Sequence, residues 1–444
     1  MKRSFIIILS YLLWGQSEDV TLTVYKDGTA LIKQPVAWVI PAGKSFVTWE
    51  SLPKGIHKDT PFLNLDGATV ISQKFNDNIF SAAGYYKRLL GKNVDIDPKK
   101  GKQMSGKLLE INSNTVTIQH KTGILTFNRN EIEHLGSQDF IEDPNLSPFL
   151  SWDLESSQSS EVSGELVYKS SNFSWNTIYR LKMTDESKGE LIAEAVVSNM
   201  SDISFYNANL KLVEGHLNKI RKPRPERFYR TNMAASRVEP EPAMDKGTLG
   251  DYHIYSINEA HDLESNESIT LRMYGPLDID YKKTYVFENT ERRQKEEPLE
   301  VRLEINNKEA NGLGIVLPDG NVEMYSYSSS GGLEYIGADK MGQVPKGQST
   351  TLSSGRAFDV IGKRWVRTYD RQRKSEEAVI EIQVTNQRAE PANIQLIEHI
   401  HGDWIIKDES LGYKKKDAST IQFSLILNGG ETKNVYYTYR KEWK

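Results

Sequence analysis

Cysteine is missing altogether from the 444-residue chain. Its absence excludes thiol catalysis, Cys-ligated zinc, iron–sulfur clusters and disulfide bonds. It leaves the redox compartment open, because a chain without cysteine is compatible with any of them. A chain of this length needs no such cross-links, since a prior of about 150 residues per domain predicts about three domains with cores of their own.

A dominant charge, long apolar runs and the common hydrolase motifs are missing as well. The 56 basic and 60 acidic residues leave a net charge of −4, which argues against nucleic acid and acidic lipid as partners. The Gly-x-Ser-x-Gly elbow, the His-Glu-x-x-His zinc motif, the phosphate-binding loop and the Ser-x-x-Lys set do not occur. We expect no nucleic-acid ligand, no cofactor and no transmembrane span in the mature chain.

The N-terminus has the pattern of a secretory signal. Lys2 and Arg3 precede an apolar run at 5–14, and Gly15 and Ser17 supply the small residues that a signal peptidase requires. The run is too short to cross a bilayer, which needs about 20 apolar residues. A buried N-terminal strand is the alternative interpretation. We expect residues 1–17 to be a signal peptide and the protein to be exported.

The rest of the chain has the sequence pattern of β structure. Residues 20–25 alternate between apolar and polar side chains, and Asp27-Gly28 marks a hairpin turn. This pattern predicts a mainly β, multi-domain chain of fibronectin- or immunoglobulin-like β-sandwiches, with an inserted small SH3-like barrel and one short helix. The expected ranges are an N-terminal β domain at 18–77, a helix at 78–91, the barrel at 92–136, a sandwich at 150–290 with a mobile loop at 217–250, and a C-terminal sandwich at 298–444.

The predictions of the helix and the barrel depend on a change in the spacing of the apolar residues. Apolar residues fall at helical spacing between Asn78 and Leu90, with Asp77 or Asn76 as the N-cap and Gly91 as the terminating residue. Five short β segments follow, separated by tight-turn sequences. They lie at 92–96, 106–111, 115–119, 124–128 and 131–135.

Two stretches of the sandwich regions resemble each other. Residues 195–199 end in Asn199 and precede a polar turn and a strand at 208–212, while residues 382–386 end in Asn386 and precede a turn and a strand at 392–396. A strand, an Asn-led turn and a returning strand at this spacing are typical of fibronectin-like sandwiches. The match suggests an internal duplication.

Several motifs occur in order along the mature chain. They include Val24-Tyr25-Lys26-Asp27-Gly28, Leu150-Ser151-Trp152, Leu317-Pro318-Asp319-Gly320, Leu333-Glu334-Tyr335-Ile336-Gly337, Gly355-Arg356-Ala357-Phe358-Asp359-Val360, Gly402-Asp403-Trp404 and Gly429-Gly430-Glu431. In this order they resemble the bacterial proteins of domain of unknown function 4139, a family related to the mucoidy-inhibitor-like envelope proteins. The resemblance implies a β-rich, envelope-associated protein of uncharacterised function in the periplasm or at the cell surface. It implies no catalytic residues.

Two groups of residues are candidate sites. His399 and His401 lie two apart on an expected strand, so both would point to one face, and Asp403 or the distant His253 would complete a metal site. Two ordinary strand-end histidines are the alternative, and it is the stronger one. The second group is a set of cations on the expected loop, which would dock an anionic envelope polymer or lipid head groups, or else belong to a plain solvated linker. It comprises Lys219, Arg221, Lys222, Arg224, Arg227 and Arg230.

These observations favour an exported, non-catalytic envelope protein that binds or scaffolds through its β-sandwich surfaces. Its partner would be an envelope protein or polymer, and unprotected strand edges would also allow self-association. The alternative is an envelope hydrolase acting on glycans or peptides, with an acid pair or the histidine strand as a metal-dependent centre. A deep cleft with converging ionisable residues would favour the enzyme, whereas edge strands with exposed aromatic residues would favour the binding protein.

Overall fold

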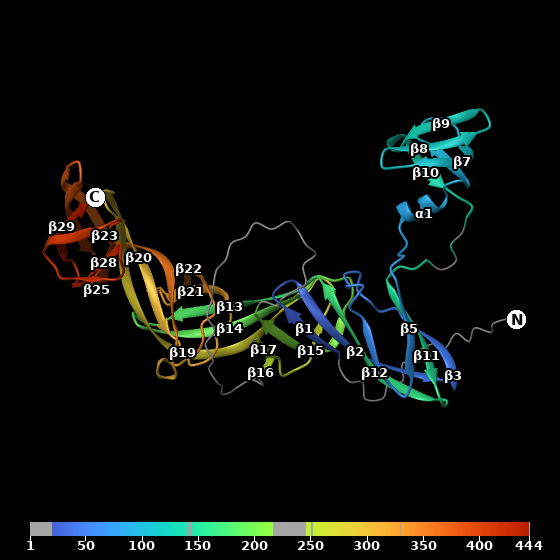
Figure 1. Ribbon diagram of the computed structural model, residues 1–444, viewed down its shortest axis with the longest axis horizontal. Helices are drawn as coiled ribbons and strands as arrows, with labels where there is room; N and C mark the ends of the chain where they lie inside the picture. The colour runs from blue at the N-terminus through green and yellow to red at the C-terminus, as the bar shows by residue number, and fades with distance from the viewer. Residues whose placement is uncertain are drawn as a thin grey trace. The chain divides into compact units, whose positions relative to one another are not determined.

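The computed structural model describes residues 20–139, 141, 144–215, 246–249, 252–328 and 330–443. The expected signal peptide at 1–17 lies outside them. The chain is mainly β, with several sheets and one α-helix among the described residues, which confirms the mainly β, multi-domain part of the predicted fold class (Figure 1). It divides into two compact units, the first formed by residues up to 174, 199–213 and 218–267, and the second by 175–198, 214–217 and 268–444. The expected range 150–290 therefore contributes strands to both units.

An eight-stranded sheet forms the centre of the first unit, in the order β16-β17-β15-β1-β2-β12-β4, with β18 paired to β15. The predicted hairpin at Asp27-Gly28 is confirmed, because Gly28 has the positive φ of +86° that the turn requires and Thr29 donates its N–H to Asp27. The strands are β1 Thr21–Tyr25, β2 Thr29–Ile40, β4 Phe62–Asp66, β12 Ser160–Ser171, β15 Phe205–Glu214, β16 Lys246–Leu249, β17 Tyr252–Ser256 and β18 His261–Leu263.

One part of the expected loop at 217–250 is a strand. Residues 246–249 form β16, which pairs in antiparallel fashion with β17, so the loop prediction is wrong there. Strand β17 is rich in residues that favour strands, and its edge is available for pairing. A strand that pairs with such an edge needs no strong periodic pattern in its own sequence. The remainder of that range lies outside the described residues.

A three-stranded sheet packs beside the eight-stranded one in the first unit. Its order is β3-β11-β5, with β3 at Gly43–Trp49, β11 at Phe149–Ser156 and β5 at Thr69–Asn76. The rings of Trp38 on β2 and Trp152 on β11 lie 5.8 Å apart, and both side chains are buried. This pair joins the cores of the two sheets.

The helix and the expected barrel strands form a further part of the first unit. The helix α1 spans Ala82–Arg88, and its N-cap is Ser81, whose hydroxyl accepts the N–H of Gly84. The expected cap at Asp77 or Asn76 is therefore wrong, since the closer hydroxyl begins the helix four residues later. The five predicted β segments are confirmed as one antiparallel sheet in the order β10-β6-β7-β8-β9. Their bounds are β6 Asn93–Pro98, β7 Met104–Ile111, β8 Thr115–His120, β9 Gly123–Asn128 and β10 Ile132–Gly136, with a 3₁₀ turn at Arg129–Glu131.

The second unit consists of a thirteen-stranded sheet that folds into facing layers. The long strand β19 pairs with β20 through residues 281–286 and with β25 through residues 285–290, so it has a partner on each edge where the two stretches overlap. The ring of Phe423 on β28 lies 5.6 Å from that of Tyr437 on β29, which brings the layers together. The strands are β13 Phe173–Met183, β14 Lys188–Asn199, β19 Glu267–Thr290, β20 Lys295–Asn306, β21 Gly320–Tyr327, β22 Leu333–Met341, β23 Ser349–Arg371, β24 Ser375–Asn386, β25 Ala392–His399, β26 Trp404–Glu409, β27 Tyr413–Lys415, β28 Thr420–Leu427 and β29 Thr432–Glu442, with a 3₁₀ turn at Glu309–Asn311.

The two stretches that resemble each other in sequence end in the same hydrogen-bond pattern. The amide of Asn199 donates to three backbone carbonyls, those of Ile203, Leu263 and Glu264, and its oxygen accepts the N–H of Ser201. Asn386 does the same with the carbonyls of residues 390, 427 and 428 and the N–H of residue 388. Both side chains are fully buried. We name these the two asparagine corners, one in each unit.

No helix among the described residues has the length and apolar character needed to cross a membrane.

Candidate functional site

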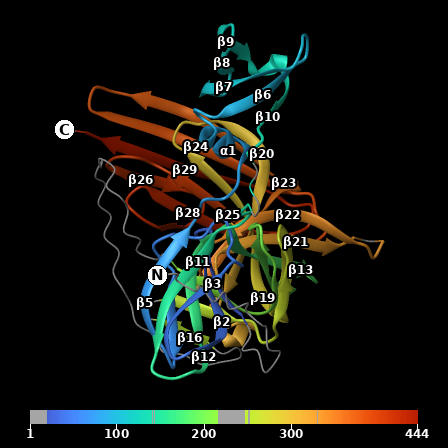
Figure 2. The same ribbon diagram turned by 90° about the vertical axis from the view of Figure 1, so that its right-hand side faces the viewer.

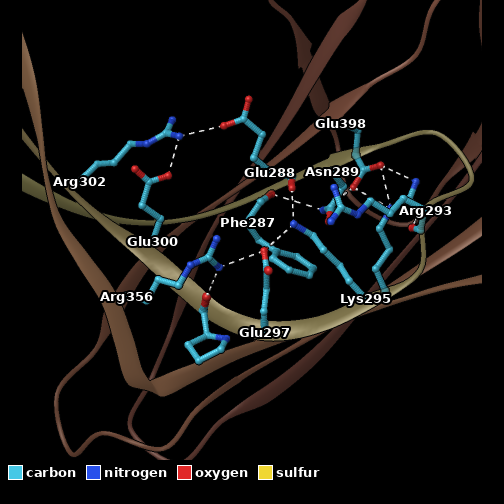
Figure 3. Close-up of polar contacts among 12 residues, drawn as sticks. Phe287, Glu288, Asn289, Arg293, Lys295, Glu297, Glu300, Arg302, Arg356 and Glu398 are labelled. Atoms are coloured by element: carbon cyan, nitrogen blue, oxygen red, sulfur yellow. Dashed lines mark hydrogen bonds and ion pairs between the residues drawn. The ribbon is translucent and has the colours of Figure 1, made fainter.

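The most polar part of the second unit surrounds a buried ion pair. Arg364 on β23 and Glu398 on β25 are almost completely buried, and the guanidinium Nη2 lies 2.7 Å from Glu398 Oε2. Tyr437 on β29 donates its hydroxyl to the same oxygen at 2.5 Å, and Asn289 on β19 donates to Oε1 at 2.8 Å. Arg364 also donates to the carbonyl of Arg293. Four strands are thereby cross-linked through one carboxylate, and Figure 3 draws the contact of Glu398 with Asn289.

The partners of Arg364 stabilise its positive charge. Burial alone would disfavour the charged form of Arg364, but Glu398 and Tyr437 outweigh it and raise the pKa of Arg364. Burial also raises the pKa of Tyr437 well above its usual value, so its hydroxyl stays protonated and donates to Glu398. Because Glu398 is closed off from solvent and fully engaged, we assign the pair a structural role.

Around this centre lies a lattice of surface ion pairs, also drawn in Figure 3. Glu288 accepts from Arg302 at 2.8 Å, and Arg302 also binds Glu300 at 2.7 Å. Glu297 accepts from Lys295 and Arg356 at 2.5 and 3.0 Å. Such half-exposed pairs fix side-chain positions more than they add stability.

The structure separates the two histidines of the sequence-predicted metal site. His399 is the last residue of β25, and its two ring nitrogens contact Glu288 at 2.7 Å and Thr420 at 3.0 Å. His401 lies beyond the strand end, so the prediction that both share one strand face is wrong, because β25 stops before the turn that leads to β26. His253 lies on β17 of the first unit. Within the described residues, no three His, Asp or Glu side chains are grouped as a metal site requires.

His401 and Asp403 instead line an open hollow next to the ion-pair lattice. Its cavity volume is about 310 Å³. Four segments meet there: the end of β19, the β23–β24 turn, the turn before β26 and the end of β29. The lining residues are Glu291, Arg292, Arg371, Glu376, His401, Gly402, Asp403, Lys441, Glu442 and Trp443.

The floor of the hollow is neutralised by one lysine. Lys441 forms ion pairs with Glu291 and with Glu376, the latter at 3.4 Å, and the side chains of Lys441 and Glu376 are nearly buried. Burial opposes the ionisation of Glu291, but Lys441 and the backbone N–H of His401 outweigh it and lower the pKa of Glu291. The floor therefore keeps the carboxylate of Glu291 charged and paired at neutral pH.

The rim of the hollow combines arginines with aromatic rings. The guanidinium of Arg371 lies 5.9 Å from the ring centre of Trp443, whose side chain is 38% exposed. Arg292 lies 5.0 Å from the ring of Tyr369 and donates to its hydroxyl at 2.8 Å. These contacts hold the two guanidinium groups beside aromatic rings, and the indole of Trp443 offers a flat apolar surface.

The sequence pattern identified two of the residues that line the hollow, but in a different role. His401 and Asp403 were candidates as metal ligands, whereas the structure places them on the wall of the hollow. Arg371, Lys441 and Trp443 were missed, because they are far apart in the chain and carry no motif. The six cations of the expected anion-docking loop, Lys219 to Arg230, lie outside the described residues.

Comparisons with known proteins add no relative. No protein-family model matches the chain, and no curated protein matches it.

Proposed function

We propose that this chain is an exported, non-catalytic protein of a bacterial cell envelope that acts by binding an envelope polymer or protein. The relation to domain of unknown function 4139, the signal peptide and the location in the periplasm or at the cell surface are parts of the same proposal. They depend on the ordered motifs and on the N-terminal pattern of the sequence.

The neutralised floor of the hollow carries the proposal. A general acid or base works best with a pKa near the operating pH, and catalytic sites raise the pKa of a carboxyl to reach it. In this hollow Lys441 has the opposite effect on Glu291, and it also holds Glu376 in an ion pair. Charged groups fixed in this way recognise a ligand and do not exchange protons with it.

The lining of the hollow favours a hydroxyl-rich ligand such as one unit of an envelope glycan. Trp443 offers a ring face, Arg371 and His401 offer donors, and Asp403 offers acceptors. A volume of about 310 Å³ is at the lower end of the range for small-molecule sites, which suits one or two sugar rings of a longer chain. The rest of the polymer would continue over the open side.

Recovery of the tagged protein with intact bacterial envelope tests the proposal. The wild-type chain should be retained, and Arg371→Ala together with Trp443→Ala should reduce retention at least about tenfold, since a few aromatic and arginine contacts dominate most binding sites. Lys414→Ala is the matched control, because it removes an exposed cation of the same unit that does not line the hollow.

Equal retention of the wild type, the double variant and the control would contradict binding through the hollow. Cleavage of glycan or peptide fragments that depends on Glu291 or Glu376 would instead support the hydrolase. Detection of the full-length chain only in the cytosol after fractionation would contradict export.

A further inference from the structure

The hairpin of β21 and β22 carries an aromatic face at its free end. Tyr325 faces Tyr335, and Tyr327 faces Leu333, so these four side chains share one side of the hairpin. Tyr335, Tyr327 and Leu333 are 60%, 55% and 43% exposed. Figure 2 shows the tip of this hairpin standing clear of the other strands of its unit.

Two tyrosines of this face, Tyr325 and Tyr335, form an ordered row, which we call the tyrosine row. Tyr325 donates its hydroxyl to Glu323 at 2.8 Å, and Glu323 is held by Arg180 at 2.6 Å. The ring of Tyr335 then packs edge-on against that of Tyr325 with 5.8 Å between centres. Because these rings have little freedom to lose, a partner that covers them meets a low entropic cost.

The backbone of the same segment has an open edge. Among the described strands β22 pairs only with β21. From Gly337 onward its other side lies against β23, where Asp339 accepts the N–H of Ser353 at 2.6 Å and a Cβ on Gly337 would meet Ser354. Residues 333–336 are all exposed and lie outside those contacts. An edge of this kind, short and apolar, is a template for another strand.

We propose that this edge pairs with the same edge of a second copy of the chain, as an antiparallel, two-fold symmetric dimer. Two-fold pairing keeps the aromatic faces on one side only when a residue of the strand lies on the axis. Centring on Glu334 sets two carboxylates directly opposite each other, which is destabilising. Centring on Tyr335 sets Tyr335 against itself and Glu334 against Ile336, and it continues the tyrosine row across four strands. Charge and side-chain complementarity therefore select the register centred on Tyr335.

The absence of cysteine gives this register a direct test. Residues opposite each other in antiparallel strands have Cα atoms about 4.5 to 5.5 Å apart, within the range that a disulfide spans. Tyr335→Cys should therefore form a disulfide-linked dimer under mild oxidation. Leu333→Cys should not, because the two copies of that residue are about 13 Å apart along the strands. Tyr206→Cys, at a tyrosine of the first unit that is 61% exposed, is the matched control for random collision.

Sedimentation of the wild type over a range of concentrations gives the second readout. We expect a monomer–dimer equilibrium that Ile336→Lys strengthens and Ile336→Glu weakens, with dissociation constants about tenfold or more apart, since the new side chain faces Glu334 twice per dimer. A wild-type chain that stays monomeric at every concentration, equal effects of the two Ile336 substitutions, or cross-linking of Leu333→Cys as fast as Tyr335→Cys would overturn the proposal. The dimer does not depend on the hollow, so loss of envelope retention leaves it intact.

Discussion

The two units of the protein differ in what they bury. Within the described residues, all six buried charged side chains belong to the second unit, and the first unit buries only apolar and neutral polar groups. Yet both units close a turn with the same buried asparagine corner. The six are Glu214, Arg364, Glu376, Glu381, Glu398 and Lys441. Both units therefore use neutral hydrogen bonds to hold a turn, and the second unit adds buried charged groups, some of which lie at its hollow.

The largest expected effect concerns the buried ion pair. Glu398→Ala should destabilise the second unit by about 3 to 5 kcal/mol, because it leaves the guanidinium of Arg364 buried without its partner. Denaturant unfolding, monitored by the hydrogen exchange of each unit separately, measures this loss of stability. The matched control replaces both partners, Arg364→Met with Glu398→Leu, and should cost far less. A single variant as stable as the double one would show that the pair does not organise the unit.

The asparagine corners should behave alike despite this contrast. Asn199→Ala and Asn386→Ala each remove the donor for three carbonyls and the acceptor for one N–H, so each should cost about 2 to 3 kcal/mol in its own unit. Local hydrogen exchange near each corner is the measurement, and Asn393→Ala, at an exposed position on β25, is the control. A loss confined to one corner would argue against an internal duplication.

Acid should affect the second unit more than the first. Burial opposes the ionisation of Glu186, Glu288 and Glu297, but arginine, lysine or histidine partners outweigh it and lower their pKa values. The described acids of the first unit with lowered pKa values are Asp77 and Asp153. A carboxyl whose pKa falls on folding stabilises the native state above its unfolded value of 4.5, and this contribution is lost as the pH drops through the lower, folded value. Thermal unfolding between pH 7 and pH 3 should lower the midpoint of the second unit first. Parallel losses in both units would contradict this expected difference.

The smallest effect should come from the surface lattice. Arg302→Gln removes ion pairs with Glu288 and Glu300 whose side chains are 29 to 43% exposed, and the expected cost is about 0.5 kcal/mol. The difference from wild type should shrink further in high salt. A cost comparable with that of Glu398→Ala would mean that the lattice, not the buried pair, holds this region together.

Local patterns in the sequence were sufficient for much of the fold. The even positions from Ala30 to Ile40 alternate cleanly and are buried together in β2. The five segments after the helix were separated by turn residues and all form strands. Strand β23 was missed although it runs from Ser349 to Arg371, because its exposed and bulged stretches have no two-residue period.

The site itself was less predictable, because its contacts are tertiary. Arg364 and Glu398 are distant in the chain, and nothing in either local sequence indicates that they pair. Lys441 joins Glu291 and Glu376 only after β19, β24 and β29 have packed. Asn199 and Asn386 were identifiable because the same local sequence, a strand followed by an Asn-led turn, precedes the same bonds.

In the proposed function, the hollow binds its ligand without reacting with it. The most direct measurement is an NMR titration that follows the indole N–H signal of Trp443 while fragments of an envelope glycan are added. We expect the signal of Trp443 to shift with saturation, this shift to disappear in Arg371→Ala, and the fragments to keep their length. An unmoved Trp443 signal, or fragments that shorten during the titration, would contradict it.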